Sequence, residues 1–128
     1  MTNHGGDESG GEADRAIWWD EELASLSLAE RRRLLVWIVE TIESDVEEAL
    51  ASGTFLARGD AHAIRTVLRV DERGWRELSQ VHLDTLDTVL RIQAASAERL
   101  TETGETGLSA LAAAFCCELP SGRAGKAR

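Results

Sequence analysis

The sequence predicts an α+β fold in which two long helices pack on a small antiparallel sheet, with disordered termini. Three observations predict it: two long stretches carry apolar residues at helical spacing, and one shorter stretch alternates apolar with polar residues. The chain has 128 residues and is 43% hydrophobic, which suits one domain with a core. We therefore expect a single domain at 15–120, between tails at 1–14 and 121–128.

The first helix is expected at 28–52. Ser27 and Glu30 match the S-x-x-E capping box, in which each side chain bonds the other residue's backbone N–H. The apolar residues that follow recur at every fourth position: Leu34, Ile38, Ile42, Val46 and Leu50. Gly53 stands just beyond them, where helices commonly end in a left-handed glycine.

The second helix is expected at 72–103, with Asp71 as its N-cap and Gly104 at its end. Its apolar residues form one broad stripe: Trp75, Leu78, Leu83, Leu86, Val89, Leu90, Ala97 and Leu100. At about 1.5 Å per residue, such a helix is roughly 45 Å long.

The sheet is expected from two segments. Residues 64–70 alternate apolar with polar side chains and are rich in β-branched residues, as in a half-buried strand. Residues 108–119 fit either a helix or a strand, and a strand at 110–119 would pair with 64–70. Because a two-stranded sheet is marginal alone, the helices must cover it or a second subunit must extend it.

The terminal segments lack the apolar residues that folding needs. Residues 1–14 hold four glycines and four acidic residues, with no lysine or arginine, and 121–128 form a short basic tail. Neither can bury enough apolar surface to offset the entropy lost on ordering, so both are expected to be disordered.

Charge and hydropathy exclude several classes of function. The net charge of −9 repels phosphate, and the only basic run is 31–33, so we expect no direct binding of nucleic acid. No apolar run approaches the ~20 residues that span a bilayer, and the N-terminus does not resemble a secretory signal. We expect a cytoplasmic protein without membrane contact.

Few residues suggest chemistry. His62 with Asp60 could begin a metal site or an acid–base pair, but we interpret His62 as an ordinary surface or strand-end histidine, since a metal site needs further ligands. Cys116 and Cys117 could form a redox pair or a metal clip, or be one buried and one exposed thiol. Because no catalytic triad or phosphate-binding glycine loop is present, we expect no enzyme activity, no cofactor and no metal.

Aromatic and charged residues point to a binding surface. Trp18 and Trp19 could line a hydrophobic pocket or an interface, or pack at the start of the first helix. Trp37 and Trp75 have a simpler explanation in core packing.

The charges of the first helix run against its dipole, because arginines occupy its first turns and glutamates its second half. Either this is a solvated face, or two copies pack antiparallel, with Leu35 and Trp37 at the contact. The candidate interface or ligand-binding set is Trp18, Trp19, Arg31, Arg32, Leu35, Trp37, Glu47 and Glu48.

Two motifs suggest a family. They are Asp71-Glu72-Arg73-Gly74-Trp75-Arg76-Glu77-Leu78 and Ile92-Gln93-Ala94-Ala95-Ser96-Ala97-Glu98-Arg99-Leu100. With the segments at 48–55 and 62–66, they make residues 18–120 resemble the C-terminal domain of bacterial winged-helix transcriptional regulators related to the ArsR type. The stretch ahead of the first helix is too short for a winged helix, so we expect either a standalone relative or a DNA-binding domain encoded further upstream. The two cysteines at 116–117 interrupt the family's Phe-Glu ending.

The resemblance implies a module for dimerisation or effector response. Its expected partners are a second copy, another regulator subunit or a small-molecule effector. The alternative is a standalone adaptor that binds one protein through the helix at 28–52.

Overall fold

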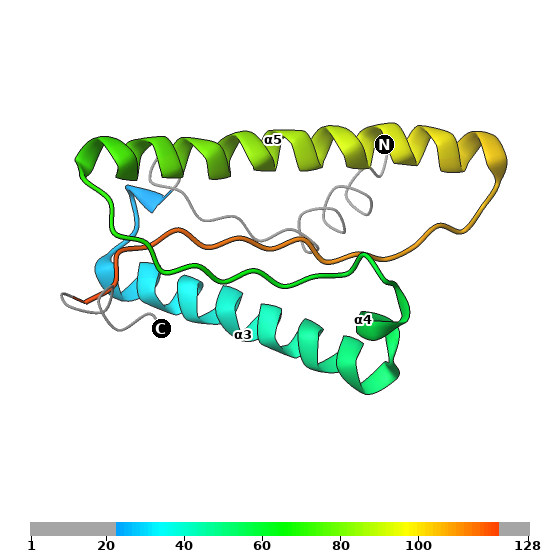
Figure 1. The fold of residues 1–128 in the computed structure, drawn as a ribbon, viewed down its shortest axis with the longest axis horizontal. Coiled ribbons are helices and arrows are strands. Elements are labelled where there is room, and N and C mark those ends of the chain that lie inside the picture. The colour runs from blue at the N-terminus through cyan, green and yellow to red at the C-terminus, as the bar shows by residue number, and fades with distance from the viewer. Residues whose placement is uncertain (1–22, 121–128) are drawn as a thin grey trace, which may run out of the picture. The chain divides into compact units, whose positions relative to one another are not determined.

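The computed structural model describes residues 23–120 of the chain. Its helices are α3 (Leu28–Ser52), α4 (Thr54–Ala57) and α5 (Glu72–Thr103), shown in Figure 1. The chain divides into two compact units, one ending at Ala61 and the other beginning at His62. The tails expected at 1–14 and 121–128 lie outside the described residues.

Helix α3 begins and ends at the residues that the sequence predicts. The Ser27 hydroxyl accepts a hydrogen bond from the Glu30 N–H at 3.2 Å, and the Glu30 carboxylate accepts one from the Ser27 N–H at 3.1 Å. At the other end Gly53 adopts the left-handed conformation, with φ of 81°, and its N–H bonds the Leu50 carbonyl. The capping box and the terminal glycine are therefore confirmed.

Helix α4 is a single turn that the sequence did not predict. Gly53 ends α3 and also caps the start of α4. The Thr54 hydroxyl donates to the Ala49 carbonyl at 3.3 Å and lies 3.0 Å from the Ser52 hydroxyl. These contacts fold the turn back onto the end of α3.

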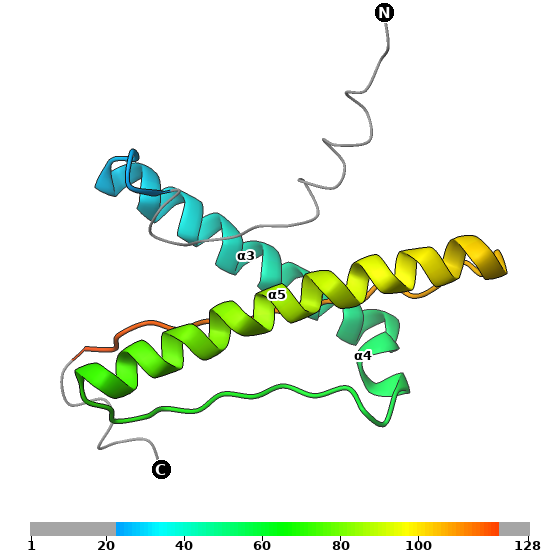
Figure 2. The same cartoon turned by 90° about the horizontal axis from the view of Figure 1, so that it is seen from above.

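Helix α5 also has the predicted bounds, and it runs unbroken for 32 residues (Figure 2). The Asp71 carboxylate accepts from the Gly74 N–H at 2.8 Å. Gly104, with φ of 72°, ends the helix and donates its N–H to the Leu100 carbonyl.

The predicted α+β fold class is wrong, because residues 23–120 contain helices and no strand. Both segments assigned to the sheet, 64–70 and 110–119, are irregular, and 108–119 is not a helix either. The alternating pattern at 64–70 has no buried face to occupy, since Ile64, Leu68 and Val70 are all exposed. An alternating sequence forms a strand only where a neighbouring strand pairs with it and a core packs against one of its faces.

Few side chains are buried. Among the described residues, the buried hydrophobic side chains are Leu23 and Ile38, at 5% and 7% exposure. The stripe on α5 is half-buried at Trp75, Leu86 and Val89, and no residue of that helix is fully buried. Apolar surface on both long helices therefore remains in contact with solvent.

Candidate interaction surfaces

The groups considered for chemistry are Asp60, His62, Cys116 and Cys117. Asp60 pairs with Arg58, whose Nε lies 3.3 Å from the carboxylate, and both side chains are exposed. Among residues 23–120, no three histidine, cysteine or acidic side chains gather as metal ligands would.

The two cysteines are free thiols, with Cys116 half-buried and Cys117 exposed. Partial burial, and then the neighbouring Cys117, raise the pKa of the Cys116 thiol above its ordinary value. Since the thiolate is the reactive form, this shift makes Cys116 a poorer nucleophile and metal ligand.

The structure gives Arg31 a local role at the start of α3. Its guanidinium donates to the Leu26 carbonyl at 3.2 Å and to the Ala24 carbonyl at 3.4 Å. These bonds fix the turn ahead of the helix and satisfy carbonyl groups there. Arg32 is exposed and has no such bond among the described residues.

The other α3 residues proposed for an interface are exposed but do not form one patch. Leu35 and Trp37 are 39% and 50% exposed, yet residues two apart lie about 200° around a helix from each other. They flank the half-buried stripe on opposite sides. Glu47 and Glu48 are exposed and lie roughly 24 Å along the axis from Arg31. Trp18 and Trp19 lie outside the described residues.

One side of α3 nevertheless has an apolar patch. Leu35, Val36 and Val39 are each more than a third exposed. At about 100° per residue they lie within one third of the helix circumference. The sequence pattern missed Val36 and Val39, because they fall outside the stripe that repeats every fourth residue.

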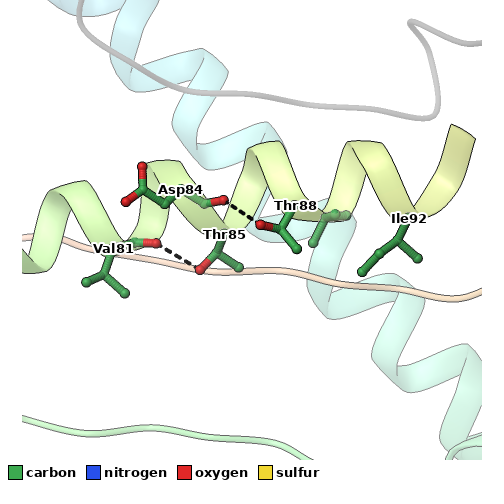
Figure 3. Close-up of a pocket in the computed structure, with 6 residues that line it drawn as sticks. Val81, Asp84, Thr85, Thr88 and Ile92 are labelled. Carbon is green, nitrogen blue, oxygen red and sulfur yellow. Dashed lines mark hydrogen bonds between the residues drawn. The ribbon is translucent and has the colours of Figure 1, made fainter.

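A second exposed surface lies on α5 and was also missed. Val81, Thr85, Thr88 and Ile92 line a shallow groove along one side of the helix, together with Asp84 and Val89 (Figure 3). Val81 and Ile92 are 59% and 58% exposed. Their alternating spacing of four and three residues is visible in the sequence and could have indicated this surface.

A further hollow lies at the start of α5, lined by Arg69, Val70, Asp71 and Gly74. It is as open as the groove on α5. Small-molecule sites usually bury most of the ligand, so neither hollow has the shape of an effector pocket.

Comparison of the chain with family models, with curated proteins and with solved structures found no match. The resemblance to ArsR-related regulators therefore remains a prediction from the residues alone. Within the described part of the chain, none of the helices is both long and apolar enough to cross a bilayer.

Proposed function

We propose that this chain is a non-enzymatic dimerisation module of the kind found in ArsR-related transcriptional regulators, acting in the cytoplasm. The observation that carries the proposal is the solvent exposure of its apolar helix surfaces. Two capped helices of 25 and 32 residues leave Leu23 and Ile38 as the buried hydrophobic side chains of residues 23–120. The resemblance of residues 18–120 to the C-terminal domains of those regulators also supports the proposal.

Exposed apolar surface on both helices favours a partner. An amphipathic helix gains most of its stability in a protein by burying its apolar face. Val36 and Trp37 on α3, and Val81 and Ile92 on α5, keep 43–59% of their surface in solvent. At about 25 cal/mol per Å² of apolar area, covering such side chains against another protein is favourable.

The charge and the open hollows narrow the kind of partner. A net charge of −9 opposes the binding of phosphate backbones, so the proposed module binds protein and leaves DNA contact to another chain or domain. The two hollows described above are open, so we favour dimerisation over effector sensing.

The alternative is an adaptor that binds a different protein through α3. It rests on the patch formed by Leu35, Val36 and Val39. A groove-bearing partner could accept such a helix face.

Sedimentation equilibrium over micromolar concentrations tests the proposal. We expect a homodimer whose dissociation follows mass action, with no binding of duplex DNA in a parallel anisotropy titration at physiological salt. A monomer throughout the range would overturn the dimerisation module and leave the adaptor. Sequence-dependent DNA binding below micromolar concentration would contradict both.

A further inference from the structure

Helix α5 carries a second set of residues at coiled-coil spacing, which shares only Leu78 with its main stripe. Leu78, Val81, Thr85, Thr88, Ile92 and Ala95 follow one another at intervals of three, four, three, four and three. This is the a/d pattern through which two helices pack with side chains interlocked. We call these six residues the α5 seam.

The two threonines do not make the seam polar. The Thr85 hydroxyl donates to the Val81 carbonyl at 2.8 Å, and the Thr88 hydroxyl donates to the Asp84 carbonyl at 3.1 Å (Figure 3). Because each hydroxyl is satisfied within the helix, a partner helix could cover it without leaving its donor unpaired. Except for the half-buried Leu78, every residue of the seam is exposed.

We infer that the α5 seam binds the seam of a second copy of this chain, with the two helices antiparallel. The inference rests on the proposed dimerisation function and names the surface that performs it. Its occupant is a second copy because the seam complements itself in both size and charge.

The size argument concerns the pairs of residues that face each other when two α5 helices pack antiparallel about a two-fold axis. If the two-fold axis passes between Thr85 and Thr88, Thr85 of each copy faces Thr88 of the other copy. On either side, Val81 meets Ile92, and then Leu78 meets Ala95. The large residue at 78 is thus matched by a small one, which lets two helices approach at the usual 8–10 Å.

The charge argument selects the antiparallel orientation. Asp84 and Arg91 hold equivalent flanking positions, seven residues apart. An antiparallel pair places Asp84 of each copy beside Arg91 of the other, whereas a parallel pair would set Asp84 beside Val89. Both side chains are exposed. Asp84 accepts a hydrogen bond from Gln80, and Arg91 donates one to the Thr88 hydroxyl. Neither has an ion pair among the described residues.

Charge reversal in the full chain tests the pairing. Asp84→Arg sets two arginines against each other at both symmetric contacts, and Arg91→Asp does the same with two aspartates. Each single variant should weaken the dimer roughly tenfold, and the double variant should restore most of the affinity. The matched control is Asp87→Arg, an identical charge change at an exposed position outside the seam and its flanks, which should leave the affinity unchanged.

Disulfide trapping tests the orientation. In a background with Cys116→Ser and Cys117→Ser, a mixture of Thr85→Cys and Thr88→Cys chains should cross-link to each other faster than either does to itself. A parallel dimer would instead favour cross-links between identical variants, which would overturn the inference.

The outcomes separate this inference from the function on which it rests. If the wild type is a dimer and Asp84→Arg weakens it no more than Asp87→Arg does, the inference about the α5 seam is wrong, while the proposed dimerisation function stands. A wild type that is monomeric at every concentration would remove both.

Discussion

Helices α3 and α5 are alike at their ends and different along their length. Each starts at a residue whose side chain bonds the third backbone N–H, and each stops at a left-handed glycine. Yet α3 contains a buried residue, Ile38, and has α4 folded against its end, while α5 has no buried residue in 32 positions. Local hydrogen bonding is sufficient to set where a helix begins and ends, whereas burial depends on what packs against it.

The difference in burial indicates which helix a partner would cover. Apolar residues are more strongly gathered to one face in α5 than in α3. Such segregation favours packing, and α5 leaves part of its apolar surface unpacked. We therefore expect association to depend more on α5 and protomer stability to depend more on α3.

The largest expected effect comes from matched isoleucine truncations. Ile38→Ala removes a side chain that is 7% exposed and should lower the free energy of unfolding by about 2–5 kcal/mol. Ile92→Ala removes one that is 58% exposed and should change protomer stability by less than about 0.5 kcal/mol, while weakening the dimer.

Urea denaturation at several protein concentrations measures both terms, since only the association term depends on concentration. Equal losses for the two variants at the lowest concentration would contradict the contrast between the helices.

A smaller effect is expected at the N-caps. Ser27→Ala and Asp71→Ala each remove a side-chain acceptor from the first turn of a helix and should cost about 1 kcal/mol. Ser44→Ala is the control, because it lies on an exposed face within α3, where alanine favours helix. Thermal or urea melts measure the change. If Ser44→Ala loses as much as the cap variants, capping does not explain the helix starts.

The smallest effect concerns charge near the positive end of each helix. Arg32 and Arg76 both occupy the fifth position of their helices and are exposed. Changing either to glutamate should stabilise the protomer by about 0.3 kcal/mol at low salt, because a negative charge suits that end of the dipole. Sizing measurements should show unchanged association. If Arg32→Glu alone weakened the dimer, the contact would lie on α3, as its reversed charges first suggested.

The helices were the predictable part of the fold. Residues 28–52 and 72–103 carry their own start and stop signals in Ser27, Asp71, Gly53 and Gly104, and both predicted ranges agree with the structure. The turn at α4 was missed because its bonds join Thr54 to Ala49 and Ser52, and no apolar repeat signals them.

The sheet failed for a different reason. Alternation at 64–70 indicates which faces a strand would have, but it cannot supply the partner strand or the core behind it. In the structure Ile64 is 82% exposed, so nothing favours extended pairing there.

The candidate binding surfaces were only partly predictable. Arg31 was expected to meet a partner, which stays a prediction, and its bonds to the preceding turn were not expected. The spacing of the α5 seam could be recognised in the sequence, but the solvent exposure of its residues could not be predicted from it. Threonines such as Thr85 and Thr88 look polar in a sequence until their hydroxyls are seen to bond the helix backbone.

Capping residues, helical periodicity and net charge act within a few residues or on the chain as a whole, so the residue order alone established the two helices and the acidic character of the protein. Strand formation and burial of a side chain depend on atoms distant in the sequence. For that reason the three-dimensional arrangement was needed to show that 64–70 and 110–119 form no sheet, that Ile38 is covered, and that Val81 and Ile92 remain open to solvent.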